Sequence, residues 1–152
     1  MKKVLFVCMG NICRSAMAEG ILQEKIQVYG LPLSVDSAGT HSYHNGEPYD
    51  PRARAELASR GINVDELRSR RIRETDFRDF DVILVADHSN LRHLREEFGD
   101  LADKAQLITH FSPVYQEQDV PDPYYGGKEG FADVYKMLDK SIDAWLEYEN
   151  LR

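Results

Sequence analysis

The sequence predicts an α/β fold, a three-layer doubly wound sandwich with a central four-stranded parallel sheet. Short apolar runs, typical of strands buried on both faces of a parallel sheet, alternate along the chain with longer segments of helical periodicity. This alternation favours parallel strands joined by right-handed crossover helices. The length of 152 residues, with 42% hydrophobic and 30% charged residues, predicts one domain over residues 1–152 with a packed core.

The first half of the chain contains two strands and two helices. Residues 4–7 are an unbroken apolar run, Val-Leu-Phe-Val, which predicts a strand at the centre of the sheet. After a Gly-Asn turn, apolar residues recur at helical spacing until Gly30 and Pro32, where we expect the helix to stop. Residues 33–39 predict a second strand that ends in a glycine turn. Asp50 and Pro51 then begin a helix that runs through Leu57 to Gly61, because Asp is a favoured N-cap and Pro a favoured first residue.

The second half continues the alternation. Residues 81–86 predict another buried strand, and residues 105–108 a shorter one. The helix between them carries Leu91, Leu94, Phe98 and Leu101 on one face. The last helix has the strongest helical period in the chain, with Phe131, Val134, Tyr135, Leu138, Ile142, Trp145 and Leu146 on one stripe. Residues 111–127 form the longest loop, and long loops in compact domains are often functional.

Charge and cysteine content restrict the partners. With 19 basic and 26 acidic residues, the formal net charge of −7 disfavours binding to nucleic acid or to anionic membranes. Cys8 and Cys13 are too few and too close for a secreted disulfide framework and have the character of cytosolic thiols. The apolar run near the N-terminus is shorter than the roughly 7 residues of a signal peptide. We therefore expect a soluble, cytoplasmic protein.

The loop between the first strand and the first helix reads Cys8-Met9-Gly10-Asn11-Ile12-Cys13-Arg14-Ser15. In open α/β sheets, ligands bind at the carboxyl ends of strands, where the next helix presents unpaired amides. A Cys and an Arg at the two ends of such a loop can enclose a tetrahedral oxyanion if the intervening N–H groups form an anion nest. Gly10 allows a close approach of the chain, and Asn11 tolerates a left-handed conformation.

Three side chains of this loop predict covalent phosphoryl transfer that needs no metal or other cofactor. Cys8 would lie at the bottom of the nest, where the helix N-terminus and a guanidinium favour the attacking thiolate. Arg14 offers a planar pair of donors that matches two phosphoryl oxygens, and Ser15 can donate its hydroxyl to the sulfur. The alternative is that Cys8 ends a buried strand and Arg14 begins a helix. That alternative leaves the coincidence of all eight residues with a strand-loop-helix context unexplained.

Residues 7–15 carry the motif V-C-x-G-N-x-C-R-S, and the sequence thereby resembles the low-molecular-weight protein tyrosine phosphatases. The resemblance continues in order along nearly the whole chain, through Asp36-Ser37-Ala38-Gly39-Thr40, Asp50-Pro51-Arg52-Ala53, residues 87–91 and Asp122-Pro123-Tyr124-Tyr125. It implies that Cys8 is the nucleophile of a cysteinyl-phosphate intermediate, that Arg14 binds the phosphoryl group and that Asp122 is the acid on a mobile loop.

The chemistry itself demands such an acid. Expulsion of a phenolate needs a positioned proton donor, which contributes about 10² to 10⁴ in rate. Asp119 and Asp122 both lie in the long loop, and Pro121 and Pro123 stiffen the backbone around Asp122. We therefore favour Asp122 and expect Asp119 to face solvent. Turn capping is the alternative role for either carboxylate.

Aromatic residues near the acid predict the substrate. Together with Met9 and Ile12, we expect Tyr43, Tyr124 and Tyr125 to line a cleft deep enough for a phosphotyrosine ring, unless they are ordinary surface aromatics. The implied partners are tyrosine-phosphorylated proteins. Relatives that act on phosphoarginine carry Thr at the position of Ile12, which favours phosphotyrosine here. The resemblance also implies that Tyr124 and Tyr125 can be phosphorylated.

Supporting roles follow for several neighbours of the loop. We expect Asn11 and Ser37 to tie the loop to the end of the second strand. Asp87 is expected to orient Arg14, unless it only caps a helix. The resemblance further implies a reversible disulfide between Cys8 and Cys13. The alternative, compatible with the first, is that Cys13 is a small buried packing residue.

The remaining charged residues carry weaker signals. The only basic run, with Arg68, Arg70, Arg71 and Arg73, is interpreted as a solvated face or as packing near the site. Relatives often have a His at the position of Leu67, so the role of that His is absent or moved here. The five histidines lack metal-ligand spacing, and we expect His41 and His44 at the edge of the cleft.

Three other functions are known or conceivable for the same fold, and the sequence excludes one of them. A thioredoxin-coupled arsenate reductase needs two further cysteines near the third strand, and residues 82–98 contain none. A phosphoarginine phosphatase and a non-catalytic phosphotyrosine-binding module are also compatible with the fold, although binding alone would not require Cys8. The chain is expected to be a monomer or a weak homodimer.

Overall fold

Four parallel strands form one sheet in the order β2-β1-β3-β4. The computed structural model describes residues 1–126 and 128–152, with side chains for all of these except residues 125, 128 and 129. The strands are β1 (Lys2–Cys8), β2 (Leu33–Gly39), β3 (Val82–Val85) and β4 (Ala105–Leu107). The predicted four-stranded parallel sheet, with the first strand in its interior, is confirmed.

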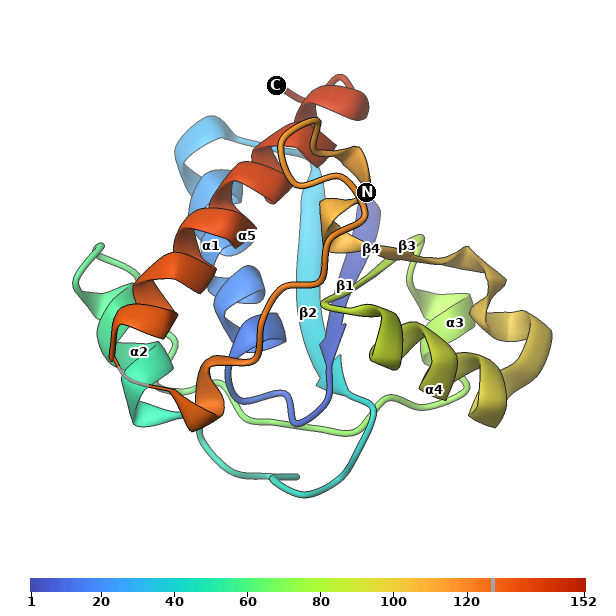
Figure 1. The fold of residues 1–152 in the computed structure, drawn as a ribbon. Helices are drawn as coiled ribbons and strands as arrows, with labels where there is room; N and C mark the ends of the chain where they lie inside the picture. The colour runs from blue at the N-terminus through green and yellow to red at the C-terminus, as the bar shows by residue number, and fades with distance from the viewer. Residues whose placement is uncertain (127) are drawn as a thin grey trace.

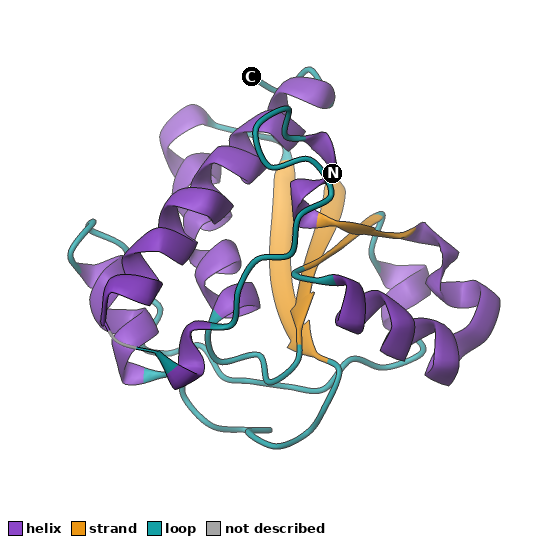
Figure 2. Ribbon diagram, viewed as in Figure 1, coloured by secondary structure: helices purple, strands orange, loops and turns teal. Residues whose placement is uncertain are grey.

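Helices cover both faces of this sheet and complete the predicted three layers (Figures 1 and 2). On one side lie α1 (Arg14–Tyr29), α2 (Pro51–Ala58) and α5 (Lys128–Tyr148), and on the other α3 (Asp76–Asp79) and α4 (His88–Phe98). The chain runs from β1 to β2 on one side and later returns to β3 on the other side of β1. The carboxyl end of β1 is therefore the topological switch point, where open α/β sheets bind ligands.

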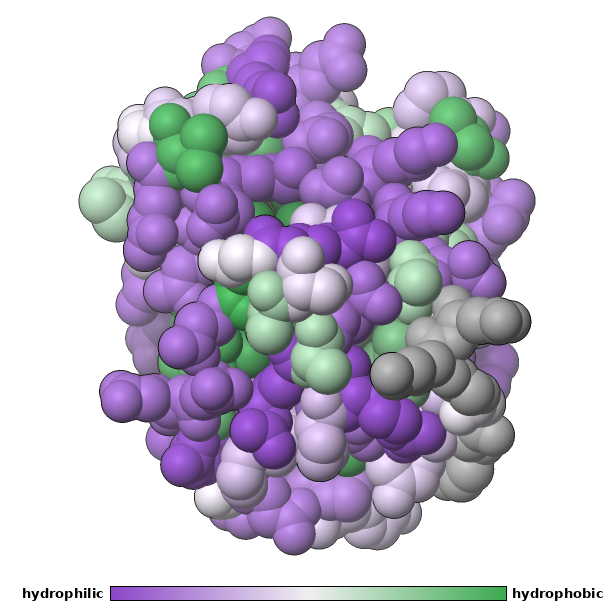
Figure 3. Space-filling view, turned by 90° about the vertical axis from the view of Figure 1, so that its left-hand side faces the viewer, coloured by the Kyte–Doolittle hydropathy of each residue, from purple (hydrophilic) through white to green (hydrophobic). Residues whose placement is uncertain are grey.

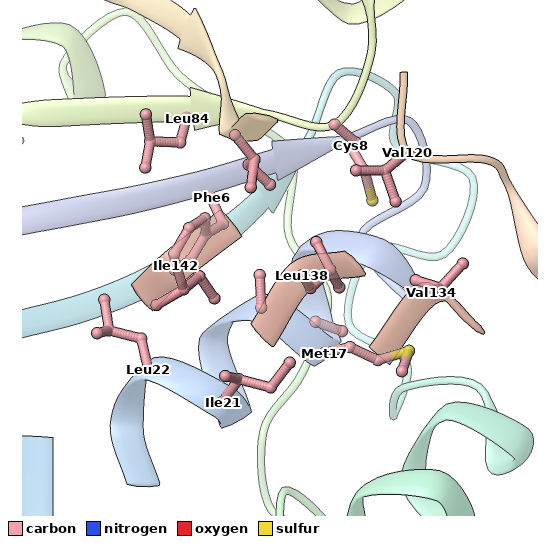
Figure 4. Close-up of a cluster of buried hydrophobic side chains, with 14 of the residues drawn as sticks. Phe6, Cys8, Met17, Ile21, Leu22, Leu84, Val120, Val134, Leu138 and Ile142 are labelled. Atoms are coloured by element: carbon pink, nitrogen blue, oxygen red, sulfur yellow. The ribbon is translucent and has the colours of Figure 1, made fainter. Parts of the chain in front are cut away.

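Strand β1 contributes to two hydrophobic cores because successive side chains of a strand point to opposite faces. Val4, Phe6 and Cys8 join the cluster beneath α1 and α5 (Figure 4). Leu5 and Val7 join the cluster that contains the α3 and α4 side chains. The four apolar residues before Cys8 are fully buried, so the end of β1 is held from both faces. This packing fixes the backbone from which the Cys8 thiol projects.

Helix α4 is shorter than its apolar period predicts. The period extends to Leu101, but the helix ends at Phe98 because Gly99, with a φ of 59° and a ψ of −131°, leaves the helical conformation for a positive-φ one that glycine adopts readily. Leu101 lies instead in the 3₁₀ helix η1 (Gly99–Lys104) and is 41% exposed. The prediction that Leu101 lies on one face of this helix with Leu91, Leu94 and Phe98 is therefore wrong.

Other boundaries differ by a few residues. Helix α2 ends at Ala58, and the turn that follows reaches the predicted end at Gly61, whose φ is 80°. Strand β4 stops before Ile108, which begins the 3₁₀ helix η2 (Ile108–Phe111). The short helix α3 and the 3₁₀ turn η3 (Pro123–Tyr125) carry too few residues to show a helical period.

The face formed by α1, α2 and α5 is mostly hydrophilic, and its apolar side chains lie in small separate patches (Figure 3). Within residues 1–126 and 128–152, no helix has the length and apolar character required to cross a membrane.

Candidate active site

The loop from Met9 to Cys13 lies against the end of β2. The backbone N–H groups of Thr40 and His41 donate to the carbonyl oxygens of Cys8 and Met9, at 2.8 and 3.0 Å. A side chain on Gly39 would prevent this contact, because its Cβ would lie 2.7 Å from the Met9 carbonyl oxygen. The glycine that ends β2 therefore allows the loop to close over the sheet edge.

Cys8 lies at the floor of the loop and is 2% exposed. Its Sγ is 3.0 Å from the hydroxyl of Ser15, which also accepts a hydrogen bond from Nδ2 of Asn11 at 2.8 Å. The Ser15 hydroxyl has one proton, for which the sulfur at 3.0 Å and the Ala38 carbonyl oxygen at 3.4 Å are the two acceptors, and the sulfur is the nearer. The expected contact between Ser15 and Cys8 is thus present in the structure.

Asn11 holds the shape of the loop through several contacts. Its φ of 56° is left-handed, a conformation that Asn tolerates. Its Nδ2 donates to Ser37 Oγ at 2.8 Å, which is the expected tie to β2, and its Oδ1 accepts from the backbone N–H of Arg70 at 3.0 Å. Ser69 Oγ donates to the Asn11 carbonyl at 2.6 Å. Part of the basic run therefore packs against this loop.

Two further buried residues, Glu19 and Tyr49, complete this network, and neither was predicted from the sequence. Ser37 Oγ donates to the carboxylate of Glu19 at 2.6 Å, and the Tyr49 hydroxyl donates to the same carboxylate at 2.8 Å. The two hydroxyls are 3.0 Å apart. Burial raises the pKa of Glu19, and the hydrogen bonds from Ser37 and Tyr49 oppose that rise. A charged residue among the apolar positions of α1 could have indicated that Glu19 is buried for a purpose. No feature of the sequence indicated a role for Tyr49.

Arg14 is the first residue of α1, and its side chain is almost fully buried. Nη1 donates to Asp87 Oδ2 at 2.6 Å and to the Val120 carbonyl at 3.0 Å, while Nη2 lies 3.9 Å from Asp122 Oδ2. Asp87 makes both of the contacts expected for it, because it also caps α4 through a reciprocal contact with Asn90. The guanidinium is thereby held at the switch point.

The two candidate acids differ in their surroundings. Asp122 lies at the edge of the loop cavity, where its Oδ1 accepts from the backbone N–H of Tyr124 at 3.0 Å and caps η3. Asp119 is exposed and accepts from the backbone N–H of His88 at 2.9 Å. Partial burial works against the charge of Asp119, but the hydrogen bonds from His88 hold its pKa below the ordinary value. Only Asp122 of this pair lines the cavity with Cys8.

A cavity of about 180 Å³ opens above the thiol. It is lined by Cys8, Met9, Gly10, Ile12, Cys13, Arg14, Tyr43, His44, Asp122 and Tyr124. Tyr43 is an exposed rim residue whose ring stacks on His41 at a centroid distance of 5.0 Å. His41 lies at an adjoining cavity of about 170 Å³. Tyr125 was also predicted to line the cleft, but its side chain lies outside the described part of the structure.

Arg70 and Cys13, two further residues considered in the sequence, are both held within the protein beside the site. Arg70 is half-buried in ion pairs with Asp36 and Asp76, at 3.1 and 2.9 Å, so it packs beside the site and is not a solvated cation. Cys13 is a free, buried thiol, and burial together with the Asp50 carboxylate raises its pKa. Among the described side chains, no group of three His, Cys, Asp or Glu residues is placed to hold a metal ion.

Comparisons of this chain with a family model, with related sequences and with solved structures all find tyrosine phosphatases. A model of the low molecular weight phosphotyrosine protein phosphatase family matches residues 3–152. The Schizosaccharomyces pombe protein of that description is 40% identical over 141 residues, or 90% of this chain and 89% of that protein. The structure of a protein tyrosine phosphatase from Entamoeba histolytica has a TM-score of 0.91 at 37% identity, covering 99% of this chain and 97% of that chain.

A protein with a different activity has a similar structure. The arginine phosphatase YwlE, of Bacillus subtilis, has a TM-score of 0.88 at 25% identity, covering 97% of this chain and 95% of that chain. Similar backbones therefore serve different phosphorylated side chains.

Proposed function

Because the chain belongs to the low molecular weight phosphotyrosine protein phosphatase family, we propose that Cys8, Arg14 and Asp122 carry out its reaction. The chain is a cysteine-dependent protein tyrosine phosphatase, a hydrolase of phosphoprotein substrates. The observation that carries these three roles is that the thiol and the guanidinium, from the two ends of one loop, and the carboxylate, from a distant segment, line one cavity.

In the first step, the Cys8 thiolate attacks phosphorus while the bond from phosphorus to the phenolic oxygen breaks, which gives a cysteinyl phosphate. The Arg14 guanidinium binds two of the three non-bridging oxygens, and backbone N–H groups of the loop are proposed to bind the third. The Ser15 hydroxyl, 3.0 Å from Sγ, stabilises the negative charge on sulfur. Asp122 gives its proton to the departing phenolate oxygen.

In the second step, the Asp122 carboxylate takes a proton from a water molecule whose oxygen attacks phosphorus. The bond from phosphorus to Sγ breaks, which returns the Cys8 thiolate and releases inorganic phosphate. The edge position of Asp122, 3.9 Å from Arg14 Nη2, supports both proton transfers. Asp119 is a poorer candidate because its carboxylate is held by His88.

The lining of the cavity supports phosphotyrosine as the substrate. Ile12, Tyr43 and Tyr124 give its walls an apolar and aromatic character suited to a flat ring, and a phosphoarginine would place a polar guanidinium there. Because the fold is shared with an arginine phosphatase, this lining is the argument that distinguishes the two substrates.

Substrate competition tests this assignment. The enzyme is incubated with phosphotyrosine peptides and with matched phosphoarginine peptides, and kcat/KM is measured for each. We expect phosphotyrosine to be the better substrate by at least about tenfold. Equal values of kcat/KM, or a preference for phosphoarginine, would overturn the proposal.

The proposal extends to the state of the thiols. We place the enzyme in the cytoplasm, because the mechanism needs Cys8 reduced and cytosolic conditions keep thiols reduced. Oxidation is proposed to form a reversible disulfide between Cys8 and Cys13. After mild peroxide and then dithiothreitol, the wild type should regain more activity than Cys13→Ser, relative to each untreated enzyme. Equal recovery would argue against the disulfide.

The remaining parts of the proposal concern organisation. Residues 1–152 act as one domain, and the chain is a monomer or a weak homodimer. The net charge of −7 supports the absence of binding to nucleic acid and anionic membranes.

A further inference from the structure

Arg52, the second residue of α2, is held by the residue that caps the same helix. Its Nε and Nη2 donate to the two carboxylate oxygens of Asp50, at 3.1 and 3.0 Å. The backbone N–H of Arg52 also donates to Asp50 Oδ1 at 2.8 Å, and Asp50 is itself buried. This fork-to-fork contact fixes the plane of the guanidinium.

The other edge of the same guanidinium contacts the turn that follows the proposed acid. Nη2 donates to the Tyr124 carbonyl at 2.9 Å, and Nη1 donates to the Gly126 carbonyl at 3.2 Å. Its Cζ lies 5.5 Å from the ring centroid of Tyr124 and 4.8 Å from that of Phe131, at cation–π distance. One side chain therefore joins α2, η3 and the start of α5.

These contacts reach Asp122 through η3. Asp122 caps that turn by accepting the backbone N–H of Tyr124, and Arg52 binds the carbonyl of the same residue. The Tyr124 peptide groups are thus held from both ends, with Asp122 on one side and Arg52 on the other. The ring of Tyr124 also lines the cavity above Cys8.

We propose that Arg52 is a positioning residue for proton transfer, which holds the acid-bearing turn and the Tyr124 ring in one arrangement over the cavity. The inference rests on the proposed role of Asp122. A lysine cannot replace the arginine, because an ammonium group lacks the planar fork that binds a carboxylate on one edge and two carbonyls on the other. The role of Arg52 is therefore to place a carboxyl group, and the arginine itself does not touch the reacting atoms.

Leaving-group dependence tests this role, because it reports on proton donation and not on general damage to the fold. A good leaving group, as in p-nitrophenyl phosphate, needs little protonation, whereas phenyl phosphate needs much. For Arg52→Lys we expect kcat/KM on phenyl phosphate, which reports on the first step, to fall at least about tenfold more than kcat/KM on p-nitrophenyl phosphate. The matched control is Arg60→Lys, which removes another arginine that pairs with a carboxylate, Glu56, and stacks on Tyr135. This control should change both rates by less than about twofold.

A double-mutant cycle with Asp122→Asn separates the two proposals. If Arg52 acts through Asp122, adding Arg52→Lys to Asp122→Asn causes no further leaving-group-dependent loss. The same loss in both backgrounds, or an Arg52→Lys loss that is equal for the two substrates, would overturn the role of Arg52. If Asp122→Asn alone shows no leaving-group dependence, the role of Asp122 fails, and the inference for Arg52 fails with it. Thermal unfolding of each variant confirms that folded proteins are compared.

Discussion

Nη1 of Arg14 donates a 2.6 Å hydrogen bond to Oδ2 of Asp87, although the two residues begin helices on opposite faces of the sheet. The contact passes over the carboxyl end of the sheet, where the chain changes direction between β2 and β3. A guanidinium buried in this way loses little entropy when it meets a phosphoryl group. The doubly wound topology therefore accounts for the preorganisation of the phosphate site.

Asp87→Asn tests this contact without removing the helix cap, because Asn and Asp are comparable N-caps. We expect kcat/KM for p-nitrophenyl phosphate to fall on the order of tenfold, since Arg14 loses its charged partner. Asp87→Ala removes cap and partner together, and its melting temperature should lie below that of Asp87→Asn. An Asn variant with wild-type kcat/KM would show that Asp87 serves α4 alone.

Asp122→Asn should slow substrates with poor leaving groups most, on the order of 10² in kcat/KM for phenyl phosphate and less for p-nitrophenyl phosphate. Asp119→Asn is the matched control in the same loop, and its steady-state rates should stay within about twofold of wild type because its carboxylate faces His88. A leaving-group effect in Asp119→Asn, and none in Asp122→Asn, would exchange the two assignments.

Tyr49→Phe should lower the free energy of unfolding by about 1–3 kcal/mol, because the buried Glu19 carboxylate loses one of its two hydroxyl donors. The pKa of folded Glu19 already lies above the ordinary 4.5, so stability from this group falls as pH rises from 4.5 through the folded value. Loss of the hydroxyl raises that folded pKa further. The stability of Tyr49→Phe should therefore decline more steeply with pH than that of the wild type.

Urea unfolding at a series of pH values measures this difference. In a Glu19→Gln background, which has no titrating group at this position, the pH dependence caused by Tyr49→Phe should vanish. Parallel pH profiles for wild type and Tyr49→Phe would mean that the hydroxyl does not act on the Glu19 carboxylate.

Gly39→Ala should disturb the loop from its β2 side, since the new Cβ would lie 2.7 Å from the Met9 carbonyl oxygen. We expect a loss of about 1–3 kcal/mol in stability and at least about tenfold in kcat/KM. Gly130→Ala is the control, because its Cβ would meet Pro123 at an ordinary 3.6 Å and Ala favours a helix. Full activity in Gly39→Ala would show that the loop tolerates displacement.

Much of the fold could be predicted because its signals are local. The apolar run of β1, the Asp50-Pro51 helix start and the stripe on α5 each depend on residues within one element. The end of α4 was missed for a local reason as well: Gly99 is a stop signal, but the apolar period continues past it to Leu101. The spacing of apolar residues does not show where a glycine with positive φ ends the helix.

The supporting residues of the site could not be predicted in the same way. Tyr49 meets Glu19 across 30 positions of sequence, and Arg52 meets Tyr124 across 72. Neither pair forms a motif, since each contact exists only after the helices have packed. The loop residues were predictable because Cys8, Asn11 and Ser15 lie within one continuous turn.

Turnover measurements combined with mass spectrometry test whether Cys8 is the nucleophile. Wild type and Cys8→Ser are incubated with p-nitrophenyl phosphate in the presence of a chelator, and acid-quenched samples are digested and analysed. We expect turnover by the wild type with a phosphoryl group on Cys8, and a loss on the order of 10⁴-fold or more in Cys8→Ser. Undiminished turnover by Cys8→Ser, or a phosphoryl group trapped on a different residue of the wild type, would contradict this expectation.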